Sequence, residues 1–203
     1  MARSTYRHYC AVAAWVALLI LAACGNTAKP TFLSTDITGA TFGKEFKLTD
    51  HTGVTRTLAD FKGKAVVLFF GYTHCPDICP ATMAELASTM QKLGKDAARV
   101  QVLFVTVDPE RDTPDTLKQY LSAFNPTFLG LYGDTQATKD IAAEFKIVYQ
   151  KQAGTVPDHH TMDHSSGIYI FDPKGQLRLY ASGSGHGGDI LARDIEELLR
   201  TTA

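Results

Sequence analysis

The sequence has no excess of charge of either sign, few cysteines, and no hydrophobic run long enough to span a bilayer comfortably. Its 20 lysine and arginine residues stand against 21 aspartate and glutamate residues, so it has no electrostatic footprint for nucleic acid. Hydrophobic residues make up 45% of the chain, which excludes an intrinsically disordered protein. These features predict one compact domain with no nucleic-acid partner.

The N-terminus has the pattern of a secretory signal. Arg3 and Arg7 precede an apolar run over residues 11–23, which is too short for a comfortable transmembrane span. The run ends in Leu-Ala-Ala-Cys at residues 21–24, which resembles a bacterial lipobox. In a lipobox the cysteine, here Cys24, is lipidated and becomes the new N-terminus. The alternative is an uncleaved anchor helix, and both interpretations place the domain outside the cytoplasm, on the periplasmic face or the cell surface.

The chain is therefore expected to have three parts. Residues 1–23 form a lipoprotein signal peptide, residues 24–38 comprise the lipidated cysteine and a flexible tether, and residues 39–203 form the folded domain.

Cysteine is scarce in the predicted mature protein. Processing removes Cys10, and lipidation blocks Cys24, so Cys75 and Cys79 are left as the free thiols. A disulfide framework cannot be built from a single local pair.

Hydrophobic patterning in the domain alternates between strands and helices. Continuous apolar runs at 65–70 and 100–107 predict central strands buried on both faces. Helical patterns and hairpin signals surround them. The expected helices are 80–93, 114–124, 135–145 and 189–199, the expected hairpins are 46–48 with 54–58 and 168–171 with 177–180, and a short strand is expected at 147–149. This order predicts an α/β sandwich with a mixed sheet and an N-terminal β-hairpin.

Cys75 and Cys79 lie at the predicted junction between a strand and a helix. Thiols four residues apart at a helix entrance share one face, so they can share a metal or close a disulfide. The helix N-terminus favours the thiolate, which would raise both metal affinity and redox reactivity. An inert disulfide that only staples the turn is the structural alternative, although the closed loop would be very short for an entropic gain.

His164 is the third candidate ligand. It lies in a polar segment, residues 157–166, expected to be a loop that meets the sheet near the cysteine turn. Two thiolates and an imidazole suit copper, since sulfur selects Cu(I) and nitrogen helps to accommodate Cu(II). Zinc fits the same ligands almost equally well, but its structural sites prefer four.

Other histidines are weaker candidates. His159 and His160, together with Met162, could form a second copper site, although a polar loop explains them as easily. His74 is expected to face solvent or to tune Cys75 rather than to bind metal. His186 lies in a glycine-rich stretch without a partner at metal-ligand spacing.

Three segments together resemble the Sco/SenC family of copper chaperones. They are residues 70–80 (FGYTHCPDICP), residues 107–114 (VDPERDTP) and residues 163–165 (DHS). The resemblance implies a thioredoxin-like fold with an N-terminal hairpin, and copper bound by Cys75, Cys79 and His164.

The resemblance also implies a partner and a role. The partner is the copper-bearing subunit of cytochrome c oxidase or another periplasmic copper acceptor. The role is assembly of the copper centre of that partner, by copper delivery, thiol reduction or both. The rival interpretation is a thiol-disulfide oxidoreductase or peroxidase that uses Cys75 and Cys79 as a redox pair. Three residues separate these cysteines, whereas thioredoxins have two, and His164 stands where a redox enzyme would have proline. A structural zinc domain, the third interpretation, lacks a clear fourth ligand.

Overall fold

The computed structural model describes residues 30–153, 160–182, 185 and 187–202. The predicted signal peptide, the lipobox and Cys24 lie outside these residues, as do His159 and His186. Within the described part of the chain, no helix is both long and apolar enough to cross a membrane.

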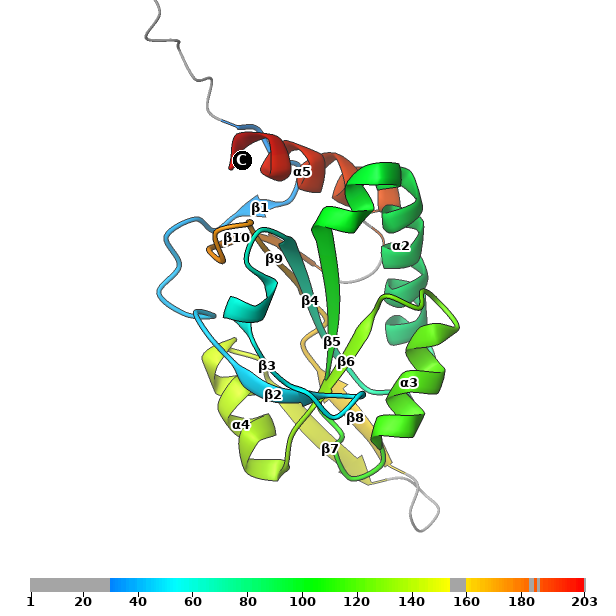
Figure 1. The fold of residues 1–203 in the computed structure, drawn as a ribbon. Helices are drawn as coiled ribbons and strands as arrows, with labels where there is room; N and C mark the ends of the chain where they lie inside the picture. Colours follow the sequence, from blue (N-terminus) through cyan, green and yellow to red (C-terminus); the bar gives the residue numbers. More distant parts are fainter. Residues whose placement is uncertain (1–29, 154–159, 183–184, 186, 203) are drawn as a thin grey trace, which may run out of the picture. The chain divides into compact units, whose positions relative to one another are not determined.

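The centre of the domain is one mixed sheet. Its strands are β1 (Thr35–Asp36), β2 (Lys47–Asp50), β3 (Thr55–Thr57), β4 (Ala65–Gly71), β5 (Val100–Thr106), β6 (Leu129–Tyr132), β9 (Ile168–Phe171) and β10 (Leu177–Ala181), in the spatial order β1-β10-β9-β4-β5-β6-β2-β3 (Figure 1). The neighbours β4, β5 and β6 are parallel, and the remaining pairs are antiparallel. Both predicted hairpins are present, and the prediction of a mixed α/β sandwich is confirmed.

Of the four α-helices in the described residues, the first two connect the parallel strands, because parallel neighbours need a crossover. The helices are α2 (Ile78–Leu93), α3 (Pro114–Ser122), α4 (Thr135–Glu144) and α5 (Gly188–Thr201), with short 3-10 helices η1 (Leu58–Phe61) and η2 (Gly94–Arg99). Two of them have side-chain N-caps: Thr113 accepts a hydrogen bond from the amide of Thr116, and Asp134 accepts one from that of Ala137. These caps explain why the starts predicted at residues 114 and 135 are correct.

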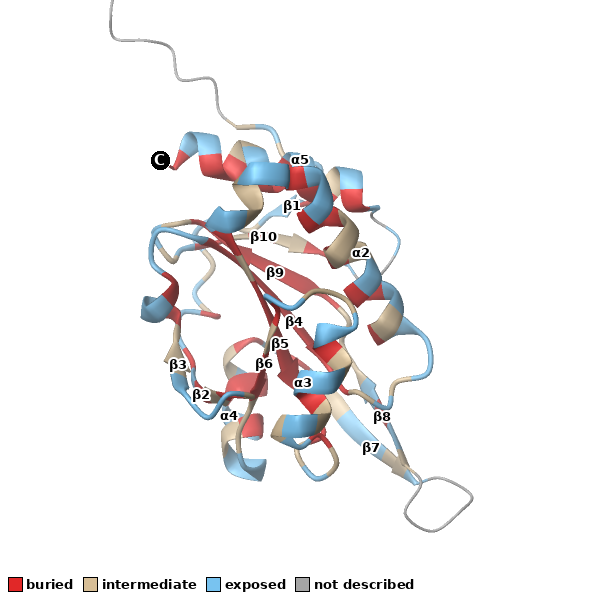
Figure 2. Ribbon diagram, turned by 45° about the vertical axis from the view of Figure 1, so that its right-hand side comes forward, coloured by how far each residue is buried: buried red, intermediate tan, exposed pale blue. Residues whose placement is uncertain are grey.

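Both faces of the sheet are covered, which explains the continuous apolar runs. The rings of Phe69 in β4 and Phe104 in β5 pack on the side of α2, whereas Phe70 of β4 contacts Phe145 at the end of α4. Every residue of β4 is buried, and the central strands are buried along their length in Figure 2. The cysteine turn therefore follows a strand that is packed into the core on both faces of the sheet.

The predicted loop over residues 157–166 is wrong for residues 160–164. The structure has a strand there, β8 (His160–His164), which pairs antiparallel with β7 (Tyr149–Ala153) in a separate two-stranded sheet. Tyr149 is opposite His164, and Ala153 is opposite His160. His164 is thus held at the end of a strand rather than in a solvated loop.

The segment that leads into β1 is attached to α5. The carboxylate of Asp194, which is buried, accepts hydrogen bonds from the amides of Leu33 at 2.9 Å and Ser34 at 2.7 Å. The part of the predicted tether from Leu33 onward is therefore packed on the domain.

Candidate metal centre

The two cysteines lie on the turn between β4 and α2. The amide of Cys75 donates to the carbonyl of Tyr72 at 3.2 Å, which closes a turn, and Cys79 lies in the first turn of α2. The amide of Cys79 points at Cys75 Sγ, with 3.4 Å between the nitrogen and the sulfur. Both thiols are free; Cys79 is fully buried, whereas Cys75 is partly exposed. The pair therefore has one inner and one outer sulfur.

Gly71 lets Cys79 lie close to the sheet. A Cβ atom at this position would be 3.0 Å from Cys79 Sγ and 2.8 Å from the ring of Phe104. The missing side chain is thus what allows the inner sulfur to lie against the end of β4. The closeness of backbone to ligand atom is a reason for glycine here that does not depend on an unusual backbone angle.

Asp112 anchors the cysteine turn through hydrogen bonds to Thr73. Its carboxylate, only 1% exposed, accepts hydrogen bonds from the hydroxyl of Thr73 at 2.5 Å, from the Thr73 amide at 3.1 Å and from the hydroxyl of Thr106 at 2.6 Å. Burial raises the pKa of Asp112, and the hydrogen bonds from the two threonines oppose that rise. Sequence reasoning recognised the segment around Asp112 only as part of a family resemblance; its role as a buried anchor was missed.

His164 completes the cluster from β8. Its Nε2 atom lies 3.5 Å from Cys79 Sγ, and its Nδ1 atom lies 3.0 Å from the carbonyl oxygen of Ser165. The ring packs edge-on against Phe69 and Tyr72, with centroids 6.3 Å and 5.9 Å away. Nδ1 can be protonated and donate to the carbonyl, which leaves the Nε2 lone pair facing the sulfur. This arrangement is the usual one for a metal-binding histidine.

The three side chains have a geometry that fits a metal ion. The Sγ atoms of Cys75 and Cys79 and one ring nitrogen of His164 all lie within 4.8 Å of one another. A metal with bonds of about 2.3 Å to sulfur and about 2.0 Å to nitrogen can bridge atoms at such separations after small side-chain movements. The structure therefore brings together the three residues that the sequence singled out.

Burial shifts the pKa values of the Cys79 thiol and the His164 imidazole in opposite directions. It raises the pKa of the Cys79 thiol and lowers the pKa of His164. Both shifts favour the neutral group, because a low-dielectric environment disfavours charge. At Cys79, burial therefore opposes the preference for the thiolate that is expected of a helix N-terminus. A cation bound at this sulfur would compensate the thiolate that burial otherwise disfavours.

The second copper site that His159, His160 and Met162 could form stays a prediction, because only two of its three residues are described. His159 lies outside the described residues, and Met162 is buried. The Nε2 atom of His160 lies 3.1 Å and 3.2 Å from the two carboxylate oxygens of Asp108. His160 is therefore engaged with a carboxylate that the prediction did not include.

His74, expected to face solvent or to tune Cys75, has a half-exposed side chain. Its ring nitrogen is 3.1 Å from the hydroxyl of Thr73 and 3.7 Å from a carboxylate oxygen of Asp112.

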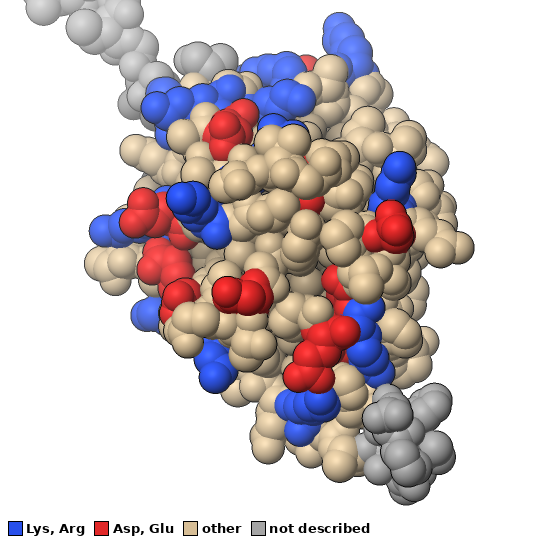
Figure 3. Space-filling view, turned by 60° about the horizontal axis from the view of Figure 1, so that its bottom comes forward, with Lys and Arg blue, Asp and Glu red and all other residues tan. Residues whose placement is uncertain are grey.

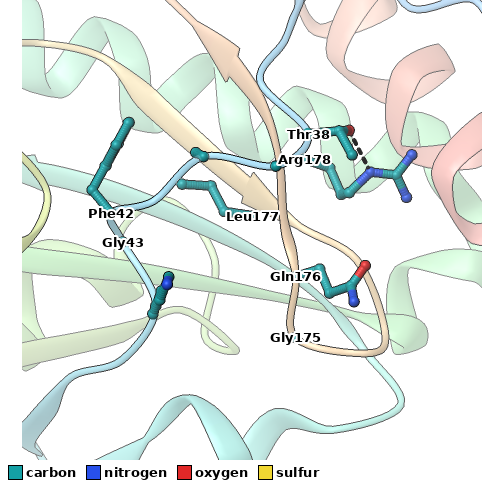
Figure 4. Close-up of a pocket in the computed structure, with 10 residues that line it drawn as sticks. Thr38, Phe42, Gly43, Gly175, Gln176, Leu177 and Arg178 are labelled. Carbon is teal, nitrogen blue, oxygen red and sulfur yellow. Dashed lines mark hydrogen bonds between the residues drawn. The ribbon is translucent and has the colours of Figure 1, made fainter.

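A surface cavity elsewhere offers no metal ligands. It has a volume of about 360 Å³ and lies between the segment before β2 and the turn joining β9 to β10 (Figure 4). Its lining contains no cysteine, histidine or carboxylate. The guanidinium of Arg178 is already bound to Thr38 and to Asp172.

Comparison with known proteins identifies the family. The SCO1/SenC family model matches residues 34–200. The chain belongs to the SCO1/SenC family. The match covers the described sheet from β1 onward and all three members of the cysteine-histidine cluster.

Curated relatives of the chain are Sco proteins. It is 40% identical over 137 residues to mitochondrial protein SCO2 of Saccharomyces cerevisiae, covering 66% of this chain and 46% of that one. It is 38% identical over 135 residues to an SCO2-like protein of Rickettsia conorii, covering 66% of each. The chain thus spans between about half and two thirds of the length of these relatives.

Solved Sco structures have the same fold. Copper-bound ScoI of Bradyrhizobium japonicum is 38% identical, with a TM-score of 0.70 over 77% of this chain and 99% of that one. The apo Sco1 protein of Thermus thermophilus is 36% identical, with a TM-score of 0.73 over 84% of this chain and 99% of that one. The expected thioredoxin-like fold of the Sco family is confirmed.

Proposed function

We propose that this protein is a copper metallochaperone that binds one copper ion through Cys75, Cys79 and His164. The observation that carries the proposal is the 3.5 Å approach of His164 Nε2 to Cys79 Sγ, because the two residues are 85 positions apart in the chain. A related protein, ScoI of Bradyrhizobium japonicum, has been solved with copper bound. Copper here is the cargo, and assembly of the copper centre of cytochrome c oxidase is the proposed task.

The ligand set favours copper over zinc. Two sulfurs and one imidazole nitrogen form a soft donor set, which selects Cu(I), and the nitrogen also accommodates Cu(II). Among the described residues, this cluster has three members, two cysteines and one histidine. A structural zinc site would normally use a fourth protein ligand.

The sulfurs of Cys75 and Cys79 are suited to different roles in copper delivery. Cys79 is fully buried, and the rings of Phe69 and Tyr72 hold the half-buried imidazole of His164 in place. Cys75 is partly exposed at the edge of the cluster. An acceptor thiol would therefore reach the cargo at Cys75 rather than at the buried Cys79, while Cys79 and His164 keep the ion in position until it is exchanged.

The face of the molecule shown in Figure 3 carries charges of both signs. Its acidic and basic side chains are interspersed. A nucleic-acid site would instead gather basic side chains in a patch or stripe. Recognition of a protein acceptor is compatible with this mixed surface.

A second function, thiol-disulfide exchange, is favoured by the closeness of the cysteines. The amide of Cys79 already points at Cys75 Sγ, and the Sγ atoms lie within 4.8 Å of each other. Closing a disulfide requires only a small movement of the side chains. A reductase acting on the copper-site cysteines of the oxidase, or on other periplasmic thiols, would use Cys75 as the accessible sulfur.

The proposed setting is extracytoplasmic, with the chain attached to a membrane through lipid on Cys24. This rests on the lipobox-like segment at residues 21–24.

Copper analysis of the purified protein in two redox states tests the proposed function. The reduced protein is expected to bind one equivalent of copper, and complete oxidation of Cys75 and Cys79 to a disulfide should abolish tight binding, because a disulfide offers no thiolate. Unchanged affinity after oxidation would place copper elsewhere. If the reduced protein bound no copper but exchanged disulfides with a thiol substrate, the reductase would take precedence.

A further inference from the structure

The hairpin that carries His164 is separate from the main sheet. Strands β7 and β8 pair with each other in a two-stranded sheet, whereas both cysteines follow directly from the eight-stranded sheet. A two-stranded hairpin alone is at best marginally stable in water. Contacts between this hairpin and the rest of the domain must therefore set the distance between His164 and the sulfurs.

Away from His164, His160 makes a buried polar contact of this kind. Residues 160, 162 and 164 of β8 alternate onto one face, since side chains along a strand have a period of two, and that face is the buried or half-buried one. At the far end of β8 from the copper ligand, His160 Nε2 lies 3.1 Å from the Asp108 carboxylate. The two side chains are only 9% and 2% exposed.

Asp108 is itself fixed to the loop after β5. Its amide donates to the hydroxyl of Thr106 at 3.0 Å, and its carboxylate accepts a hydrogen bond from Arg111 at 2.6 Å. The same Thr106 hydroxyl donates to Asp112, the anchor of the cysteine turn. One short segment therefore contacts the cysteine turn through Asp112 and the histidine strand through Asp108.

A weaker ion pair reinforces this attachment at the surface. Lys151 of β7 lies 2.5 Å from the carboxylate of Glu110, and both side chains are at least half exposed. An exposed pair of this kind contributes at most about 1 kcal/mol. Of these two polar contacts, the buried one between His160 and Asp108 is therefore the stronger, and it adds to the packing of the buried Met162 between His160 and His164.

We propose that the contact between His160 and Asp108 is a clasp that positions His164 over Cys75 and Cys79. The inference rests on the proposed function, because it concerns how the copper centre is held. His160 acts through β8 rather than by touching the cargo, so it is a positioning residue. Losing the contact would let the hairpin move and lengthen the distance from His164 to the sulfurs.

A metal-binding role for the same side chains is less well supported. Ligand atoms of Asp108, Glu110 and His160 lie within 4.8 Å of one another. However, the two carboxylates are already paired, with Arg111 and Lys151 respectively. A divalent cation would have to compete with both positive charges.

Three variants of the full chain test the clasp. His160→Ala should change the thiolate-to-Cu(II) charge-transfer absorption and speed copper loss to a chelator about tenfold. This is near the low end of the loss in metal affinity that follows replacement of a residue supporting a metal ligand. His160→Gln, whose amide can still donate to Asp108, should restore much of the retention. His51→Ala is the matched control, because His51 also makes one ring hydrogen bond, accepting from the Gly130 amide at 3.0 Å. It should leave the copper spectrum unchanged even if it lowers stability.

The outcomes separate the clasp from the proposed function. If His164→Ala alters the copper spectrum but His160→Ala is superimposable on the parent, the clasp is refuted and the copper site stands. If His164→Ala also leaves the spectrum unchanged, the copper site itself is wrong. The remaining alternative is a metal site at Asp108, Glu110 and His160. A Cys75→Ser/Cys79→Ser variant that still binds one copper, and that loses this copper when His160→Ala is added, would place the metal there and overturn the clasp.

Discussion

His164 Nε2 lies 3.5 Å from Cys79 Sγ, with the histidine at the end of β8 and the cysteine in the first turn of α2. The imidazole reaches the sulfur with its other nitrogen already turned to the Ser165 carbonyl. The inner half of the cluster is thus arranged by the fold before any cargo arrives. This preorganisation reduces the ordering cost of binding.

Gly71→Ala should displace Cys79 and loosen the copper centre. The new methyl group would lie 3.0 Å from Cys79 Sγ and 2.8 Å from Phe104, and overpacking of this kind costs about 1–3 kcal/mol. Copper release to a chelator and thermal unfolding measure the two effects. Gly130→Ala is the control, because its methyl group would press on Leu121 at 2.9 Å and should lower stability without changing the copper spectrum. Equal copper release by both variants would contradict a specific role for Gly71.

Asp112→Ala should destabilise the domain and free the cysteine turn. It leaves the Thr73 amide and the Thr106 hydroxyl without their carboxylate, and unsatisfied buried groups cost about 1–3 kcal/mol each. Denaturant unfolding measures the loss, and copper release reports on the turn. Asp115→Ala, which removes an exposed carboxylate three residues later, should cost less than about 1 kcal/mol. Similar losses in the two variants would argue against Asp112 as an anchor.

The reduced, copper-free protein should lose stability at alkaline pH because of Cys79. Burial raises the pKa of this thiol in the folded state, so its contribution is fully present below the unfolded pKa of about 8.5. Above that value the unfolded chain releases the proton first, and stability falls with rising pH. Denaturant unfolding from pH 7 to 9.5 should show this decline in the parent and a shallower one in Cys79→Ala. Parallel curves would mean that the thiol is not protected from ionisation.

Cys24→Ala should block lipidation and lipoprotein processing. Metabolic labelling with a fatty acid reports the modification directly. Cys10→Ala, which alters a cysteine within the predicted signal peptide, should still be labelled. If Cys24→Ala and the parent are labelled equally, the lipid is not on Cys24.

Local sequence patterns predicted the core well because burial on both faces leaves a continuous apolar run. This is true of β4, and the period of apolar side chains likewise revealed most of α2. The cysteine pair could be found by its spacing. Its association with His164 required the order of the elements, since no local signal links residues 85 positions apart.

The hairpin of β7 and β8 could not be predicted from local pattern. Its strands, YQKQA and HTMDH, are mostly polar and have exposed positions on one face. The inward face of β8 is formed by His160, Met162 and His164. These potential metal ligands among polar residues favour a loop over a strand when the sequence is taken alone. The anchoring role of Asp112 was equally hidden, because a buried carboxylate and a surface carboxylate look alike in sequence.

The most direct test of the account is the Cu(II) absorption spectrum of His164→Ala beside the parent and His186→Ala. The imidazole is the only nitrogen ligand proposed, so its loss should change the thiolate-to-Cu(II) charge-transfer bands and weaken copper binding by more than about 100-fold, beyond the cost of losing an outer partner. The Cys75–Cys79 disulfide should still form, and His186→Ala should match the parent. If the spectra of parent and His164→Ala are superimposable, His164 is not a ligand and the proposed copper centre is wrong.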